Sequence, residues 1–268
     1  MPICYVNSGF ENITGYNKVE VTGNNCRFLQ GKERDELACE QIRFAIKEKR
    51  ELRVVLRNFR KDGSALWNSL FLSPVPDESG IITHYIGIQT DITEQKKYEQ
   101  ELAYTTSHDL LTGLPNRRLL LDRLSQSISI SSRHKERVAI FLIDLDHFHL
   151  INDNLGHSIG DEVIRQISAR IRNKVRVGDT LARVEGDEFV LMIPDVKSVD
   201  QINLIKTKLL KMISMPIEVD GHTVQVTASI GISLADDLLK EPAALIRQAD
   251  LAMHEAKQFG RNNAQWYN

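Results

Sequence analysis

The chain has 268 residues and a formal net charge of -2, from 34 Lys and Arg against 36 Asp and Glu. Hydrophobic residues make up 42 % and charged residues 26 %, which excludes disorder and collagen-like repeats as the dominant state. The near balance of charge also argues against a protein whose main task is the electrostatic binding of nucleic acid.

The length exceeds one average domain, so two domains are expected. The longest stretch free of Asp, Glu, Lys and Arg covers residues 221–235, which is shorter than the ~18 residues of a membrane span. The N-terminus lacks the basic region and apolar run of a signal peptide. The three cysteines, Cys4, Cys26 and Cys39, form neither a CxxC pair nor a disulfide framework. We therefore expect a cytoplasmic protein without a membrane or nucleic-acid partner.

Residues 1–93 predict a small α+β sensor domain with an antiparallel sheet. The elements expected in chain order are a strand over 3–6, short helical pieces within 9–23, a helix over 34–49, and strands over 52–59, 66–73 and 81–92. Turn residues fill 61–64 and 74–80, between these strands. Helices followed by such a meander are typical of this class.

A helical linker is predicted over residues 94–107, because residues 93–107 contain no Gly or Pro and Thr93 can cap a helix. Tyr98, Leu102 and Thr105 follow the alternating spacing of four and three residues that forms the seam of a coiled coil. The alternative is a lone solvated helix. We expect the linker to pair two copies of the chain.

Residues 108–268 alternate between helix and strand and predict a ferredoxin-like palm. The expected helices cover 117–127, 158–175, 202–213 and 242–258, and the expected strands cover 138–143, 180–184, 189–193, 217–219, 223–226 and 228–234.

Acidic residues occupy two places that a palm brings together. Asp144 and Asp146 follow the strand over 138–143, and Asp187 and Glu188 lie in the hairpin turn after residue 184. Carboxylates at this edge can share Mg²⁺ or Mn²⁺ ions, and paired metals neutralise a triphosphate. Solvated surface loops are the alternative. The sequence has no Walker A loop and no Gly-x-Gly, so a nucleotide would be held by other means.

Four ordered blocks resemble the GGDEF domain of diguanylate cyclases, a likeness that covers His108 to the C-terminus. They are DLLTGLPNRR (109–118), DLDHFHLINDNLGHSIGD (144–161), EGDEF (185–189) and ADLAMHEAKQFGRN (249–262). The resemblance implies condensation of two GTP into cyclic di-GMP and two pyrophosphates. Each 3′-hydroxyl attacks the α-phosphate of the GTP held by the other subunit, so a homodimer is expected.

The resemblance also implies a role for individual residues. The expected metal ligands are Asp144, the carbonyl of Leu145, and Asp187. The expected catalytic residues are Asp187, Glu188 and Lys257. The expected GTP-binding residues are Asn152, His157, Asp161, Lys257 and Arg261. Asn152 and Asp161 would read guanine, because a carboxylate can accept both of its adjacent N–H groups.

Two positions depart from the family pattern, and one motif adds a regulatory expectation. Glu185 replaces the first glycine of the signature, and His149 replaces a phosphate-binding lysine, so weakened GTP affinity is expected. Arg176 and Asp179 match the RxxD product-inhibition motif and would bind cyclic di-GMP. A surface ion pair is the alternative.

The first domain carries chemistry of a different kind. Cys26 lies beside Arg27, a cation that favours a thiolate and anion binding, and Arg43 on the next helix could join Arg27 at a phosphate. Three amides fall one on each predicted strand, at Asn58, Asn68 and Gln89. Facing one surface, they would suit a heterocycle with both N–H groups and carbonyls.

These residues resemble a LOV domain, the flavin-binding blue-light branch of the PAS family. The blocks PICYVNSGFENITGY, GNNCRFLQG, NFRKDGSALWNSLFLSPV and YIGIQTDIT cover Pro2 to Thr93. The resemblance implies FMN, with Cys26 as the photoactive residue that adds to flavin C4a. The expected FMN-binding residues are Asn25, Cys26, Arg27, Gln30, Arg43, Asn58, Asn68 and Gln89.

The sequence therefore predicts a blue-light-regulated diguanylate cyclase, with activation by light as the expected direction. The alternative is a light-gated module that binds GTP or cyclic di-GMP with weak or no catalysis, given Glu185 and His149. A weaker alternative makes Cys26 a redox sensor. LOV domains normally begin with an earlier strand, so we expect either a longer native chain or a sheet edge that is open or filled by a partner. The C-terminal sequence also resembles cyclase domains that continue into a phosphodiesterase domain.

Overall fold

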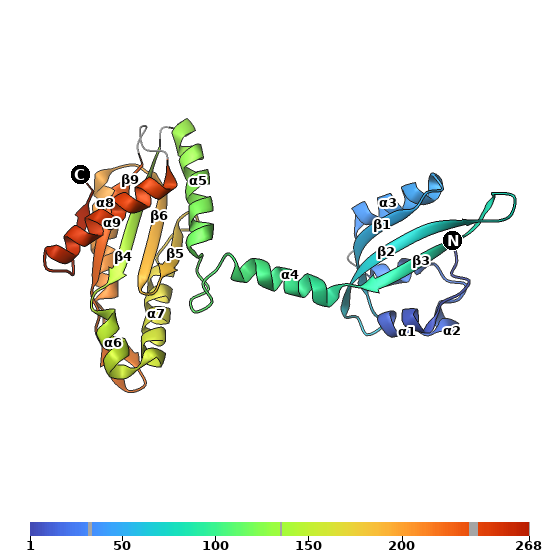
Figure 1. The fold of residues 1–268 in the computed structure, drawn as a ribbon, viewed down its shortest axis with the longest axis horizontal. Helices are drawn as coiled ribbons and strands as arrows, with labels where there is room; N and C mark the ends of the chain where they lie inside the picture. Colours follow the sequence, from blue (N-terminus) through green and yellow to red (C-terminus); the bar gives the residue numbers. More distant parts are fainter. Residues whose placement is uncertain (32–33, 135, 236–240, 268) are drawn as a thin grey trace. The chain divides into compact units, whose positions relative to one another are not determined.

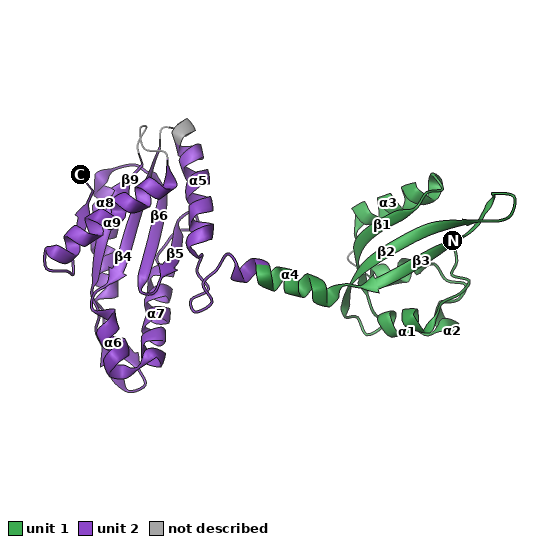
Figure 2. Cartoon of the chain, in the orientation of Figure 1, with its two compact units in different colours: residues 1–102 green, residues 103–268 purple. Residues whose placement is uncertain are grey.

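The computed structural model describes residues 1–31, 34–134, 136–235 and 241–267. The chain divides into two compact units, residues 1–102 and 103–268 (Figure 2). The boundary falls inside helix α4 (Thr93–Thr105), which belongs in part to each unit. None of the helices in the described residues has the length and hydrophobicity that a membrane span requires.

The first unit consists of a three-stranded antiparallel sheet and short helices (Figure 1). Its strands, in spatial order, are β1 (Leu52–Phe59), β2 (Ala65–Pro76) and β3 (Ile82–Asp91). The helical elements are α1 (Ser8–Thr14), α2 (Lys18–Val21), the 3-10 helix η1 (Cys26–Gln30) and α3 (Glu36–Lys47). The Asp35 carboxylate caps α3 by accepting from the Ala38 amide at 3.0 Å. Ala38 packs on Val54 and Leu56 of β1, so this face of the sheet is the buried one.

Two predictions for this unit are wrong. Residues 3–6 form no strand; instead the Ile3 amide donates to the Asn24 carbonyl, and the Ile3 carbonyl accepts from Gly23. Strand β2 continues through Pro74 to Pro76, where the sequence predicts a turn. The β1 pairing ends at Leu72, so beyond it β2 has a neighbour on one side alone and tolerates residues without an N–H.

Helix α4 has no buried residue, and Tyr98 and Leu102 are 66 % and 65 % exposed. Its start is fixed by the sheet rather than by the predicted Thr93 cap. Asp91 accepts from the Thr93 amide at 2.8 Å and pairs with Arg60 at 2.6 Å. The Thr93 hydroxyl accepts from the Trp67 amide at 3.0 Å. The end of β3 and the first residue of α4 are therefore both bonded to the sensor sheet.

The second unit contains a five-stranded sheet in the order β10-β9-β4-β6-β5. The strands are β4 (Arg137–Leu145), β5 (Thr180–Glu185), β6 (Glu188–Val196), β9 (Ala228–Leu234) and β10 (Ala264–Trp266). Strands β4, β5, β6 and β9 pair antiparallel, and β10 is parallel to β9. With helices α7 (His157–Arg172) and α8 (Val199–Ile213) as connections, these four give the predicted split βαβ arrangement.

Helices cover both faces of this sheet. Phe141 and Ile143 of β4 share one buried cluster with α7 and α8, whereas Ile140 and Leu142 share another with α5 (Arg117–His134) and α9 (Pro242–Gln258). Burial on both faces explains the continuous apolar run of β4. The two remaining strands, β7 (Ile217–Val219) and β8 (His222–Val224), form the predicted hairpin.

Helix α9 approaches β9 unusually closely. A Cβ atom at Gly231 would clash with the α9 backbone at Ala249 and Met253. The helix therefore packs backbone against backbone, which fixes the positions of Asp250 and Lys257 relative to the sheet.

Three further elements differ from the prediction. Helix α5 extends beyond residue 127 to His134, and helix α6 (Phe148–Leu155) and strand β10 were not predicted. Helix α6 follows His147, at φ 57, and ends at Gly156, at φ 89. It is too short and too rich in Asn and Asp to show a helical periodicity.

Candidate functional site

Carboxylates gather where β4 ends and β6 begins. Asp144 lies opposite Glu188 in the register of these strands and is 8 % exposed. The Lys257 ammonium, carried by α9, lies 2.7 Å from the Asp144 carboxylate. The structure thus brings Asp144, Glu188 and Lys257 together at one end of the central strands. Asp144 and Lys257 are 113 residues apart in the chain.

The acidic cluster has an excess of negative charge. Burial raises the pKa of Asp187, and the negative charge of Asp144 raises it further, against the opposing effects of Lys257 and His149. Burial also raises the pKa of Glu188, followed by the charges of Asp144, Asp250 and Asp187. A divalent cation would relieve this repulsion, and carboxylates with a backbone carbonyl are the ligands that Mg²⁺ prefers.

No group of three or more His, Cys, Asp or Glu side chains within the described residues is arranged to hold a metal ion. The Lys257 ammonium lies 2.7 Å from Asp144 Oδ2 and takes up one of the accepting positions of that carboxylate. The oxygen donors of Asp144, Asp187 and Glu188 fit Mg²⁺ or Mn²⁺ in their chemistry.

Arg183 stabilises the signature turn between β5 and β6 through a hydrogen bond. Gly186 adopts a left-handed φ of 48°, and its carbonyl accepts from Arg183 Nε at 2.8 Å. Arg183 Nη1 also donates to both oxygens of Asp109 at 3.1 Å. Burial alone would raise the pKa of Asp109, but hydrogen bonds from Thr112 and the Arg183 guanidinium outweigh it and lower that pKa. This contact joins the 109–118 block to the turn.

The residues expected to read guanine lie at the junction of α6 and α7. Asn152 is on α6, His157 begins α7, and Asp161 follows one turn later on the same face, with His157 and Asp161 exposed. A Cβ at Gly160 would clash with the Asn152 side-chain oxygen. A glycine at this place therefore lets the amide lie against α7.

The predicted product-inhibition residues form a closed turn. The Arg176 amide donates to the Asp179 carboxylate at 3.1 Å, and the Asp179 amide donates to the Arg176 carbonyl at 3.0 Å. Burial raises the pKa of Asp179, with Arg176 opposing the shift. Both residues line a pocket of about 680 Å³, together with Lys174 and Lys208. The pocket presents cations beside an apolar floor.

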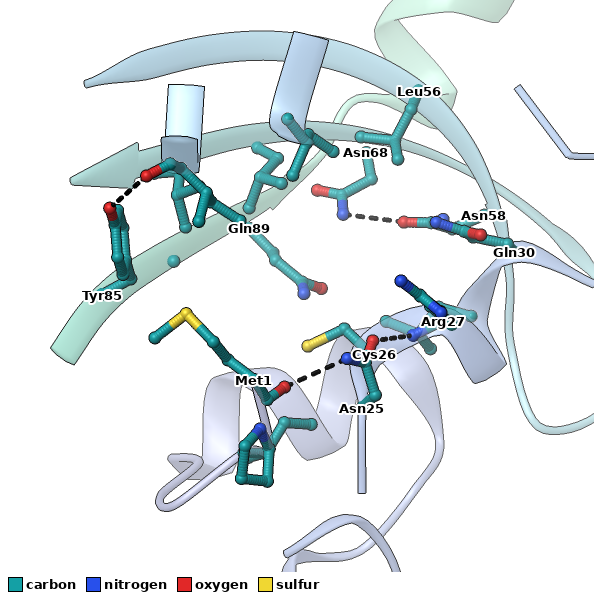
Figure 3. A pocket seen from close by; sticks show the side chains of 18 of the residues that line it. Met1, Asn25, Cys26, Arg27, Gln30, Leu56, Asn58, Asn68, Tyr85 and Gln89 are labelled. Carbon is teal, nitrogen blue, oxygen red and sulfur yellow. Dashed lines mark hydrogen bonds between the residues drawn. The ribbon is translucent and has the colours of Figure 1, made fainter. Parts of the chain in front are cut away.

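A second pocket, of about 350 Å³, lies in the first unit between the sheet and α3 (Figure 3). It is lined by all eight residues that the sequence predicts for FMN, namely Asn25, Cys26, Arg27, Gln30, Arg43, Asn58, Asn68 and Gln89. The Cys26 sulfur and the Gln89 amide point into the same space (Figure 3). Cys26 is exposed to solvent, yet partial desolvation raises the pKa of its thiol, which does not favour the thiolate that the neighbour Arg27 suggested.

The amides of this pocket are incompletely satisfied. The Asn68 side-chain nitrogen donates to the Asn58 oxygen at 2.9 Å. The Asn68 Oδ1 and Gln89 Oε1 atoms are buried and accept no hydrogen bond within the described residues. Since an unpaired buried acceptor is costly, a ligand with N–H groups fits these atoms. The chemistry and volume of the pocket therefore suit a flavin ring.

The chain was compared with known families and proteins. Residues 106–263 match the family model described as "Diguanylate cyclase, GGDEF domain", and residues 1–94 match a PAS domain. The chain is 43 % identical over 170 residues to the bifunctional diguanylate cyclase/cyclic di-GMP phosphodiesterase MucR of Pseudomonas aeruginosa, covering 63 % of this chain and 25 % of MucR. It is 40 % identical over 163 residues to diguanylate cyclase TpbB of the same species, covering 60 % of this chain and 38 % of TpbB.

A solved structure comprising only the GGDEF domain of TpbB, from Pseudomonas aeruginosa, superposes with a TM-score of 0.58 at 38 % identity. The superposition covers 60 % of this chain and 94 % of that one. The chain thus spans between a quarter and two fifths of the length of these two curated relatives, and the likeness to them lies in the second unit.

Proposed function

Because the chain belongs to the GGDEF diguanylate cyclase family and carries a PAS domain at its N-terminus, we propose that it is a blue-light-regulated diguanylate cyclase. It would condense two GTP into cyclic di-GMP and two pyrophosphates. The observation that carries this proposal is the cluster of Asp144, Asp187 and Glu188, whose negative charge exceeds the positive charge of the neighbouring Lys257.

The residues of the cluster divide the chemistry between them. Asp144, the Leu145 carbonyl and Asp187 would hold Mg²⁺ or Mn²⁺, which when bound neutralises phosphate charge. The 3′-oxygen of one GTP bonds to the α-phosphorus of the other as the bond from that phosphorus to pyrophosphate breaks. Glu188 or Asp187 accepts the hydroxyl proton.

The nucleotide would be held from two sides. Asn152, His157 and Asp161 bind guanine at the α6–α7 junction, while Lys257 and Arg261 bind phosphates at the end of α9. One domain holds one GTP, so the reaction needs two copies of the chain. The exposed Tyr98 and Leu102 of α4 support pairing of the copies through a coiled coil.

The first unit would bind FMN, which supplies absorption of blue light when bound. Arg27 and Arg43 would hold its phosphate, and Asn58, Asn68 and Gln89 its ring. The unpaired Asn68 and Gln89 oxygens support this assignment. Light control would depend on the Cys26 thiol.

The deciding experiment measures cyclic di-GMP formed from GTP and Mg²⁺ by chromatography, in matched dark and blue-lit samples. We expect more product in the light. Cys26→Ala should form equal amounts in both. Equal product from the wild type in both samples would remove light control from the proposal, and light control that persists in Cys26→Ala would remove the thiol.

The second candidate is a binding module without efficient catalysis. Two residues favour this candidate. Glu185 is exposed in the signature turn, and His149, whose charge opposes the rise in the Asp187 pKa, occupies the position where the family has a lysine. The double variant Glu185→Gly with His149→Lys separates the two. If the wild type binds GTP without turning it over, and only the double variant turns GTP over, the native protein is a binding module.

Product inhibition completes the proposal. Arg176 and Asp179 would bind cyclic di-GMP at the mouth of the 680 Å³ pocket. Arg176→Ala should lose inhibition by added cyclic di-GMP while the initial rate stays within about twofold. Unchanged inhibition would exclude this turn as the binding site.

A further inference from the structure

The second acid at the end of β4, Asp146, accepts three hydrogen bonds from the protein. It is 5 % exposed. Its Oδ1 accepts from the Ser229 hydroxyl at 2.7 Å, and its Oδ2 accepts from the Thr227 hydroxyl at 2.7 Å and from the Asn262 amide at 3.0 Å. Its own amide donates to the Thr227 carbonyl at 2.8 Å. Two hydroxyls and an amide thus already donate to this carboxylate, so a metal ion would compete with these donors for its oxygens.

The segment that Asp146 holds is strained. Gly260, Arg261 and Asn262 all have left-handed backbones, at φ values of 98°, 60° and 48°. Only the first is a glycine, and asparagine tolerates this region, so Arg261 is the residue held in a conformation that its side chain disfavours. Such conformations persist where the surroundings over-determine them, and they gather at functional sites.

This segment carries the exposed side chain of Arg261, directly after α9. Its other backbone bonds run to α9 and to β9. The Arg261 amide donates to the Ala256 carbonyl at 3.2 Å, and the Asn263 carbonyl accepts from Ile230 at 3.0 Å. The bond from Asn262 to Asp146 ties it to β4, the strand that ends in Asp144 and Leu145.

We propose that Asp146 is a positioning residue for nucleotide binding. By accepting from the Asn262 amide it holds the strained segment in place, so that the Arg261 guanidinium meets the GTP phosphates near the Asp144 end of β4. Asp146 acts through Arg261 and not through the metal. The phosphate-binding role of Arg261 rests on the proposed function, whereas the ordering of the segment does not.

The first test is Asp146→Asn, which keeps the shape of the side chain. Asparagine offers one accepting oxygen instead of two, so the three donors can no longer all be satisfied. We expect the KM for GTP to rise about tenfold with kcat within about twofold, and the Mg²⁺ dependence to stay unchanged. A shifted Mg²⁺ dependence would make Asp146 a metal-site residue and overturn the proposal.

The matched control is Thr227→Val, which removes a donor from the same Asp146 oxygen and leaves the Asn262 bond intact. Its KM should stay within about twofold of the wild type. Thermal unfolding of both variants shows whether each one folds. If both raise KM equally, Asp146 serves the packing of the strands and the proposal fails.

A double-mutant cycle isolates the coupling to Arg261. Binding of a non-hydrolysable GTP analogue is measured by calorimetry for the wild type, Asp146→Asn, Arg261→Ala and the double variant. Asp146→Asn should cost about tenfold in the wild type and almost nothing once Arg261 is alanine, because the two act as a unit. Additive losses would contradict the proposal.

A fourth measurement needs no nucleotide. Hydrogen exchange of the Asn262 amide in the ligand-free chain should be at least about tenfold faster in Asp146→Asn, whereas Thr227→Val should leave it unchanged. Unchanged exchange in Asp146→Asn overturns the inference even if the chain is a cyclase. If the wild type does not bind GTP, the proposed function fails, and faster exchange still supports the ordering of this segment.

Discussion

The two ligand sites of this protein leave different needs unmet. In the first unit, neutral amides line a pocket together with Arg27 and Arg43, and the Asn68 and Gln89 oxygens accept no hydrogen bond within the described residues. In the second unit, the Lys257 ammonium pairs with Asp144, and burial and neighbouring negative charge raise the pKa values of Asp187 and Glu188. The first site needs a ligand with N–H groups, and the second needs positive charge. The unmet need thus identifies the class of ligand at each site.

The strongest test of this contrast removes one charge from the second site. Asp187→Asn should lower cyclic di-GMP formation by about 10³-fold, because a neutral amide holds a divalent cation far less well than a carboxylate. Chromatographic assay of the product measures the loss, with circular dichroism as the control for folding. Activity above about a tenth of the wild type would show that the charge of Asp187 is dispensable.

The converse test removes an unmet hydrogen bond from the first site. Gln89→Leu deletes the unpaired buried oxygen at similar volume, so the ligand-free unit should gain about 1 kcal/mol of stability. The affinity for FMN should fall roughly 10–100-fold, since the ligand loses a partner. Fluorescence titration with FMN and thermal unfolding of the ligand-free chain report the two effects. A loss of stability without ligand would mean that the amide is satisfied inside the protein.

Arg183 tests a charge that is already paired. Arg183→Leu should lower the free energy of unfolding by about 2 kcal/mol at pH 7, because Asp109 and the Gly186 carbonyl lose their donor. The folded pKa of Asp109 is lowered, so this stabilisation is full above the unfolded value of about 3.9 and is lost as pH falls through the folded value. Urea unfolding at pH 7 and at about pH 2.5 should therefore show a large and then a small difference. A difference independent of pH would point to packing alone.

The smallest effect concerns repulsion within the acidic cluster. Glu188→Gln should raise the melting temperature without divalent cations by roughly 1–2 °C, after allowance for screening by solvent. The folded pKa of Glu188 is raised, so its ionised form costs stability at neutral pH and the cost disappears as pH falls through that value. The gain should therefore vanish in acid, and calorimetry at pH 7 and about pH 4 checks it. A lower melting temperature at pH 7 would show that Glu188 is already compensated.

Local patterns were enough to predict where these sites lie. The apolar run of β4 and the β5–β6 hairpin place Asp144 and Glu188 by strand register, and the three strands of the first unit each supply one amide. What sequence reasoning missed depends on long-range contacts. Arg183 meets Asp109 across 74 residues, and Asn262 meets Asp146 across 116. No periodicity connects such pairs, although Asp109 and Asn262 lie inside the recognised blocks.

Two other errors arise from surroundings that a sequence does not show. The neighbour Arg27 suggested a thiolate at Cys26, but partial desolvation raises the thiol pKa. The turn residues at 74–80 suggested an early end to β2, but pairing with β3 carries the strand to Pro76. In both cases a nearby residue was visible in the sequence and the decisive tertiary environment was not.

The exposure of helix α4 determines whether residues can be inserted into the chain between its two units. Because none of its residues is buried, inserted residues would remove no side chain from either core. Each inserted helical residue turns everything beyond it by about 100° and advances it by about 1.5 Å, so seven residues nearly restore the original rotational phase. Residues inserted in this helix would therefore change the rotational phase of its exposed faces and leave the buried side chains of each unit in place.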